Sequence, residues 1–158
     1  MRISRLDIMK YTVVAMIVAY IVVLVINLGG SSKPFEVVAA SVQAGIHTEN
    51  LGRADDQRFR RNYGYNVADF DGVLLYASQF RLSAEEVLLI KVKSTSQVNE
   101  VRQVIEERLQ SRRQDFDGYA PEQVQLIDQA QLVVRGNYIF LAVGQNADEY
   151  RKLFLNSL

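Results

Sequence analysis

The sequence VVRGNYIFLAVG, residues 133–144, contains two runs of β-forming residues on either side of Arg-Gly-Asn. Gly136 and Asn137 tolerate the positive φ angles that tight turns need, so the stretch predicts a β-hairpin. The turn requires neither Arg135 nor Tyr138. These two residues are therefore candidates for binding a partner or a polymer.

A second pair of strands is predicted upstream of this hairpin. GVLLYASQF (residues 72–80) and EVLLIKVK (residues 86–93) are rich in β-formers and are separated by a short loop. In the later strand, apolar residues alternate with Lys91 and Lys93, which indicates that one face of the sheet is partly exposed to water. Together with the hairpin, these runs predict a four-stranded antiparallel sheet.

Helical patterns fill most of the chain around these strands. The clearest pattern follows Ser94, which forms a capping box with Gln97. Pro121 followed by an acidic residue is typical of another helix start. The predicted helices cover residues 35–46, part of 52–66, 94–113, 120–130 and 147–158. We therefore expect an α+β domain with helices packed mainly on one face of the sheet.

The N-terminal region contains the longest apolar segment of the chain. Residues 11–28, YTVVAMIVAYIVVLVINL, include no charged side chain. As a helix they would extend roughly 27 Å, which nearly spans the hydrocarbon core of a bilayer. The segment therefore predicts a single transmembrane helix. A cleaved signal peptide is the alternative, although its apolar region usually has only about 7–15 residues.

The charges around this segment predict its orientation. Three basic residues lie within residues 1–10, whereas only Lys33 follows the segment closely. The positive-inside rule then places residues 1–10 in the cytoplasm. Residues 29–34 would form a short flexible linker, and residues 35–158 an extracytoplasmic domain held at the cell membrane.

Three residues of the apolar segment are candidates for contact with another membrane helix. Ala15 and Ala19 form a small-xxx-small pair that permits close approach, although alanine is common in any such helix. The Tyr20 hydroxyl, near the middle of the bilayer, would need a partner or water. We therefore expect lipid and a membrane-protein partner around this helix.

The composition limits the chemistry available to the chain. The 158 residues include 18 Lys and Arg and 18 Asp and Glu, so the chain has no net positive charge that would attract nucleic acid. We therefore do not expect nucleic acid as a partner. Cysteine is absent and histidine occurs once, which excludes disulfides, thiolate nucleophiles and the usual zinc sites. We expect no cofactor and no metal.

The motif DFDG occurs twice, at residues 69–72 and 115–118. Neither copy has the further ligands of an EF-hand calcium loop, so a turn-forming role is favoured. No nucleophile elbow, phosphate loop or histidine-containing triad accompanies them, and we predict no catalytic residue. A hydrolase in which Asp115 and Asp117 meet in a cleft is an alternative. The single histidine, His47, is expected to be solvated at a helix end.

A basic and aromatic cluster lies within residues 52–66. Arg58, Arg60 and Arg61 are interspersed with aromatic residues, and stacking combined with phosphate contacts would bind an anionic polymer of the cell envelope. The alternative is a solvated helix whose arginines pair with nearby carboxylates.

A family resemblance is found in three stretches of the sequence: EVLLIKVK, ERLQSRRQDFDGYAPEQ (residues 107–123) and VVRGNYIFLAVG. From residue 35 to about 154, the order of motifs resembles a bacterial family of domains of unknown function, number 4358, found mostly in clostridial surface proteins. The resemblance implies tethering at the surface, in many relatives through a cysteine that this chain lacks, and it implies no known activity. The occurrence of relatives beside membrane-bound acyltransferases would imply a role in surface-polymer modification.

These features predict a membrane-anchored, extracytoplasmic accessory protein of a bacterial cell envelope. We expect it to be a non-catalytic interaction partner of a membrane protein, in the polymer-modifying context that the resemblance implies. A binding module for an anionic cell-envelope polymer is the alternative.

Overall fold

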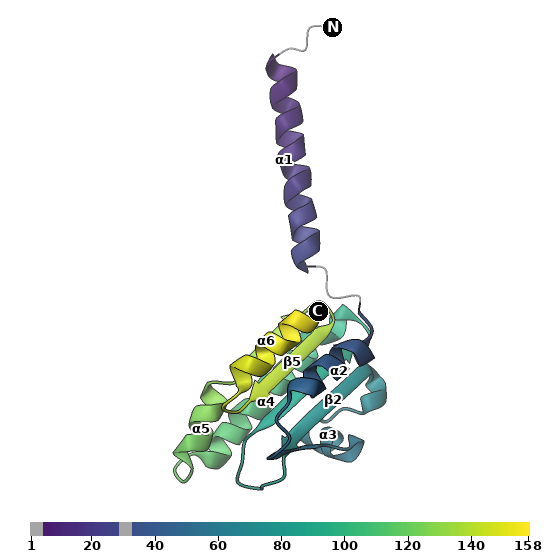
Figure 1. The fold of residues 1–158 in the computed structure, drawn as a ribbon. Helices are drawn as coiled ribbons and strands as arrows, with labels where there is room; N and C mark the ends of the chain where they lie inside the picture. Colours follow the sequence, from purple (N-terminus) through teal and green to yellow (C-terminus); the bar gives the residue numbers. More distant parts are fainter. Residues whose placement is uncertain (1–4, 29–32) are drawn as a thin grey trace. The chain divides into compact units, whose positions relative to one another are not determined.

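The computed structural model describes the backbone of residues 5–28 and 33–158. Within residues 5–28, it describes the side chains of residues 10–21. The chain divides into two compact units, Met1–Gly30 and Ser31–Leu158. Figure 1 shows the elements of both units.

In the described part of the first unit, the chain forms the helix α1 (Arg5–Leu28). Among the described residues, no helix has both the length and the apolar character that crossing a membrane requires. The predicted transmembrane segment, residues 11–28, includes residues 22–28, whose side chains lie outside the described residues. Residues 1–4 and 29–32, which belong to the predicted cytoplasmic terminus and linker, also lie outside them. The transmembrane helix stays a prediction.

Residues 33–158 contain an antiparallel sheet of five strands in the order β1-β2-β3-β5-β4. The strands are β1 (Leu51–Arg53), β2 (Phe70–Ser78), β3 (Glu86–Val92), β4 (Gln131–Arg135) and β5 (Tyr138–Val143). The two predicted pairs, β2 with β3 and β4 with β5, are confirmed. Pairing of β3 with β5 joins them into one sheet.

The prediction of four strands is wrong because it omits β1. This strand has only three residues, Leu-Gly-Arg, and it pairs with the end of β2, with Leu51 opposite Ser78. Glycine is a poor strand former, and a three-residue run gives no detectable alternation. The strand therefore forms through its pairing with β2 rather than through local propensity.

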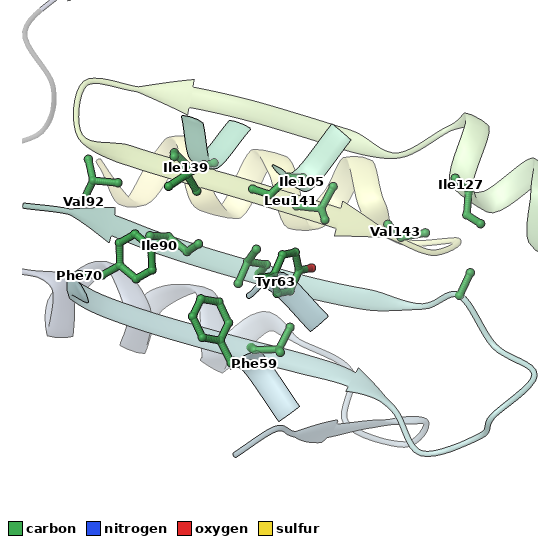
Figure 2. Packing of buried hydrophobic residues seen from close by; sticks show 14 of the residues in the cluster. Phe59, Tyr63, Phe70, Ile90, Val92, Ile105, Ile127, Ile139, Leu141 and Val143 are labelled. Carbon is green, nitrogen blue, oxygen red and sulfur yellow. The ribbon is translucent and has the colours of Figure 1, made fainter. Parts of the chain in front are cut away.

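Helices cover both faces of the sheet, which gives the domain three layers. The first face is covered by α3 (Asp56–Tyr63), α4 (Val98–Phe116) and α5 (Pro121–Asp128). The second face is covered by α2 (Phe35–Gly45) and α6 (Ala147–Ser157). Figure 2 shows core side chains of the first face, with Phe59 and Tyr63 of α3 among the residues of the sheet. The α+β class is confirmed, but the prediction of helices mainly on one face is wrong.

The sequence of β3 explains the second helical layer. Residues 87–90 are four consecutive apolar residues, and all are buried. Such a continuous run is typical of a strand that is covered on both faces. The expected wet face is therefore wrong at the centre of the sheet. Lys91 instead donates from Nζ to the Lys33 carbonyl at 3.0 Å and lies 5.3 Å from the Tyr138 ring centroid.

Helix α2 approaches the sheet closely at Gly72. The Phe35 ring occupies the place that a Cβ on residue 72 would take. A side chain there would displace the ring, so glycine lets α2 begin directly over β2. The pairing of β2 with β3 also shifts register between Phe70 and Gly72.

Short turns complete the domain as the sequence indicates. Gly136 has a φ of 58°, and no non-glycine residue of the described chain has a positive φ, so the β4–β5 turn has the pattern of type II′. The predicted capping box is present, with the Ser94 N–H donating to Gln97 Oε1 at 3.2 Å. It caps the 3₁₀ turn η2 (Thr95–Gln97), which leads into α4; a second 3₁₀ turn, η1 (Val67–Asp69), precedes β2.

Candidate binding cleft

A polar cleft lies where β5 ends and α6 begins. Its volume is about 420 Å³, within the range of roughly 300–1,000 Å³ that is usual for small-molecule sites. Three apolar side chains contribute to its wall, namely Leu51, Leu126 and Val143. Carboxylates and amides make up most of the remaining lining: Glu49, Glu85, Asn50, Gln123, Gln145 and Asn146.

Two hydrogen bonds between distant segments hold the rim of this cleft. The His47 N–H donates to the Tyr150 hydroxyl at 3.2 Å, which joins the loop after α2 to α6. The Ala84 N–H donates to Gln123 Oε1 at 2.8 Å, which joins the loop before β3 to α5. Tyr150 and Ala84 are buried and Gln123 is half-buried, so these bonds tie the loops at the rim of the cleft to the body of the domain.

The lining of the cleft carries an excess of negative charge. Glu49 and Glu85 contribute carboxylates, and among the described residues that line it there is no Lys or Arg. His47 lies at the rim, with Nε2 3.9 Å from the Glu149 carboxylate, and both of these side chains are more than half exposed. Apolar walls beside charged groups strengthen their attraction for an opposite charge. The cleft is therefore suited to a polar ligand that carries a basic group.

The sequence alone does not predict this cleft. Its residues come from four separate stretches, 47–51, 85, 123–126 and 143–150. No motif links them, because they meet only after the strands have paired and the helices have packed. The single local signal is the cluster of polar residues, Gly-Gln-Asn, between β5 and α6.

Comparison with known families covers most of the same region. The model of a family described as a domain of unknown function, DUF4358, matches residues 44–144, which is more than half of the 158 residues. This chain belongs to the DUF4358 family. The match confirms the family resemblance, over a shorter range than residues 35–154. No curated protein and no solved structure matches the chain.

The DUF4358 match includes all five strands and the larger part of the cleft. Residues 47–51, Glu85 and residues 123–126 lie within it, whereas residues 145–150 follow directly after its end. The family is one of unknown function, so the match establishes membership and leaves the activity to be argued from the site.

In this DUF4358 member, the three arginines of the predicted basic cluster lie in different environments. Arg58 is half-buried and donates from Nη2 to the Ser78 carbonyl at 2.7 Å, so it holds α3 to the end of β2. Arg60 and Arg61 are exposed. The aromatic rings of Phe59 and Tyr63 are buried in the core and are not available for stacking on a polymer.

The two hairpin residues predicted as binding candidates also differ in their exposure to solvent. Arg135 is exposed, and its Nη1 donates to the Val134 carbonyl at 3.3 Å. Tyr138 is fully buried and its hydroxyl donates to the Lys33 carbonyl at 2.9 Å. Burial, together with the nearby carboxylates of Glu36 and Asp71, raises the pKa of Tyr138 to about 12. Tyr138 is therefore placed as a core residue, and Arg135 as a surface one.

In the first unit, the predicted packing residues Ala15, Ala19 and Tyr20 are all exposed. In the second unit, Asp115 and Asp117 are exposed as well, and Asp115 pairs with Arg112 at 3.4 Å. Neither aspartate lines the cleft, so the hydrolase alternative loses the arrangement on which it depended. The described residues include no group of three or more His, Asp or Glu side chains placed to hold a metal ion.

One carboxylate next to the cleft has a structural role instead. Glu86 accepts two hydrogen bonds from Arg108, at 3.0 and 3.2 Å, and the exposed fractions of the two side chains are 5% and 18%. The Arg108 guanidinium lies 5.0 Å from the Tyr63 ring centroid. Burial, reinforced by the Glu86 carboxylate, raises the pKa of Tyr63 well above its usual value. Because Arg108 neutralises Glu86, the charge of the cleft comes from Glu85 and Glu49.

Proposed function

We propose that this chain is a membrane-anchored, extracytoplasmic accessory protein and that its domain binds a membrane-protein partner of the cell envelope through the β5–α6 cleft. In this proposal the domain is non-catalytic. The partner inserts a segment with a basic side chain between Glu49 and Glu85. Modification of a surface polymer is the process in which we place the pair.

The anchor is supported by the sequence of the first unit. Residues 11–28 contain no charge, and the basic residues near the N-terminus outnumber those directly after the segment. Both features favour a single span with the N-terminus in the cytoplasm. A linker of six residues reaches at most about 20 Å when extended, so the domain would stay close to the membrane and to proteins within it.

The cleft is the observation that carries the binding function. It combines an apolar wall, amides that can donate and accept hydrogen bonds, and two carboxylates with no basic side chain among the described lining residues. Burying a basic side chain from a partner between them would neutralise the excess charge, and such desolvated charge pairs contribute to specificity. A volume of about 420 Å³ accommodates a few side chains of a loop.

Photo-crosslinking in native membranes tests this proposal. A photoreactive residue would replace Gln145, which is exposed and lines the cleft, and in a matched variant Gln110, which is exposed on α4. We expect a discrete adduct with one membrane protein from position 145 and not from position 110. Combining the probe at position 145 with Glu49→Gln and Glu85→Gln should abolish that adduct, because these changes remove the negative charge.

Two outcomes of this experiment would contradict the proposal. Equal adducts from positions 145 and 110 would show that the cleft has no special role. An adduct that persists in the Glu49→Gln/Glu85→Gln background would exclude recognition through these carboxylates.

Binding of an anionic envelope polymer is the second candidate. Its support is the pair of exposed side chains Arg60 and Arg61 in the last turn of α3, where their charges are free to contact phosphate groups. Arg58 is better assigned to the fold, because it bonds the Ser78 carbonyl. This candidate predicts the opposite crosslinking pattern, with adducts to polymer from a probe at Gln57, which is exposed on α3 one turn before Arg61, and none from position 145.

A further inference from the structure

The outer edge of β4 is open in the second unit. Within the described residues, β4 pairs along one side only, with β5. Figure 2 shows it as the outermost strand, joined by the hairpin to the strand that carries Ile139, Leu141 and Val143. Leu132, Val133 and Val134 are each only partly buried. An edge of this kind is a template for pairing with another strand.

The hairpin register determines which backbone groups face outward. Arg135 is opposite Tyr138 across a two-residue turn, so these two form a hydrogen-bonded pair, as does Val133 with Phe140. The alternate residues of β4, Leu132 and Val134, must then direct their N–H and C=O groups away from β5. These groups are the ones available to a further strand.

We propose that the strand bound at this edge is β4 of a second copy of the chain, antiparallel and centred on Val133. In this register Leu132 lies opposite Val134 of the second copy, so the outward-facing groups of both residues become hydrogen-bonded partners. Gln131 lies opposite Arg135 of the second copy, so the Arg135 side chains of the two copies do not face each other. All five residues of β4 are paired, and the result is one continuous sheet across a two-fold axis.

The character of the two sheet edges supports this choice. Edge strands are normally protected by shortness, proline, inward-pointing charge or a bulge. The edge strand β1 has only three residues, so its shortness protects it from pairing with another strand. In contrast, β4 has five residues and no proline, and its only charge is Arg135 at the end. The Arg135 guanidinium bonds the outward Val134 carbonyl and would exchange this bond for the backbone of the second copy.

The symmetry of the pairing is compatible with the membrane anchor that we have proposed. This compatibility, unlike the open edge and the register of β4, depends on the proposed anchor. A two-fold axis through an antiparallel pair runs perpendicular to the sheet, so both copies present the same face to the same side. Lys33, which precedes α2, is held on the face covered by α2 and α6 through bonds to Tyr138 and Ser157. Lys33 of both copies would therefore lie on the same face of the dimer.

Disulfide trapping tests the register directly, because the chain contains no cysteine. At the centre of the dimer, Val133 faces its own copy in a non-hydrogen-bonded pair, where Cα atoms are about 4.5 Å apart, a distance that a disulfide spans. Val133→Cys in the full-length chain, oxidised in native membranes, should give several-fold more covalent dimer on a non-reducing gel than Arg53→Cys. Arg53 is the matched control, since it is exposed at the opposite edge.

Two results would overturn the proposal. One is a yield of covalent dimer from Val133→Cys no greater than from Arg53→Cys. The other is a monomeric mass for the cysteine-free, full-length protein in detergent at about 0.1 mM, because association would then be weaker than roughly 5 kcal/mol. Neither result would affect the assignment of the cleft, which involves other residues.

Discussion

Replacing Glu86 with alanine is expected to lower the free energy of unfolding by about 3–5 kcal/mol. Glu86 and Arg108 form a bidentate ion pair between β3 and α4 in which Glu86 is buried and Arg108 is largely buried. Removing one partner leaves the other charge without compensation in a poorly solvated site, which costs more than the pair itself contributes. Urea unfolding of the full-length protein in detergent, followed by circular dichroism, measures the change.

Two further variants identify the cause of this loss. Glu106→Ala removes an exposed partner of Arg102 and should cost less than about 1 kcal/mol, because surface ion pairs contribute little. Glu86→Leu combined with Arg108→Met removes both charges and should recover most of the stability. If Glu86→Ala is no more costly than Glu106→Ala, the pair is not buried as described.

Replacing Phe154 with alanine should lower the free energy of unfolding by about 3–5 kcal/mol. Phe154 is fully buried, and its ring stacks on Phe140 of β5 with 4.8 Å between centroids and 6° between planes. It is also 6.4 Å from the Tyr138 ring. The alanine would leave a cavity between α6 and the second face of the sheet. The same unfolding measurement applies.

A matched phenylalanine provides the control for this variant. Phe80 is 65% exposed in the loop between β2 and β3, so Phe80→Ala should change stability by less than about 0.5 kcal/mol. Similar effects of the two substitutions would contradict the packing of α6 on the sheet, and with it the three-layer arrangement.

The parts of the fold that could be predicted from sequence are those fixed by local interactions. The Gly136 turn sets the β4–β5 hairpin, and the Ser94 capping box sets the start of the helical region that contains α4. Both involve residues only a few positions apart. In contrast, β1 depends on pairing with β2, and the second helical layer depends on α2 and α6 reaching the same face from opposite ends of the domain.

The alternation in β3 was misleading for a physical reason. Lys91 and Lys93 lie at the end of the strand, where a long side chain can extend to solvent or to a carbonyl while its stem stays packed. The centre of the strand, residues 87–90, contains no polar residue and indicates burial on both faces. The run at the centre is the stronger signal, because it lies where both helical layers meet the sheet.

The candidate site could be predicted less well than the fold. The prediction of a stacking surface overlooked that Phe59 and Tyr63 are four positions apart, a spacing that places both side chains on one face of a helix. The cleft had no equivalent signal. Glu49 and Glu85 are far apart in the sequence and meet only because β1, β2 and β3 place the two loops at one end of the sheet.

Labelling of single cysteines in intact cells tests the central claim most directly, namely that an extracytoplasmic domain has its cleft occupied by a partner. Gln110→Cys and Gln145→Cys would each be treated with a maleimide that does not cross membranes. We expect rapid labelling at position 110, labelling several-fold slower at position 145, and equal rates once the protein is purified in detergent. Absence of labelling at position 110 in intact cells, or equal rates at both positions there, would contradict the account.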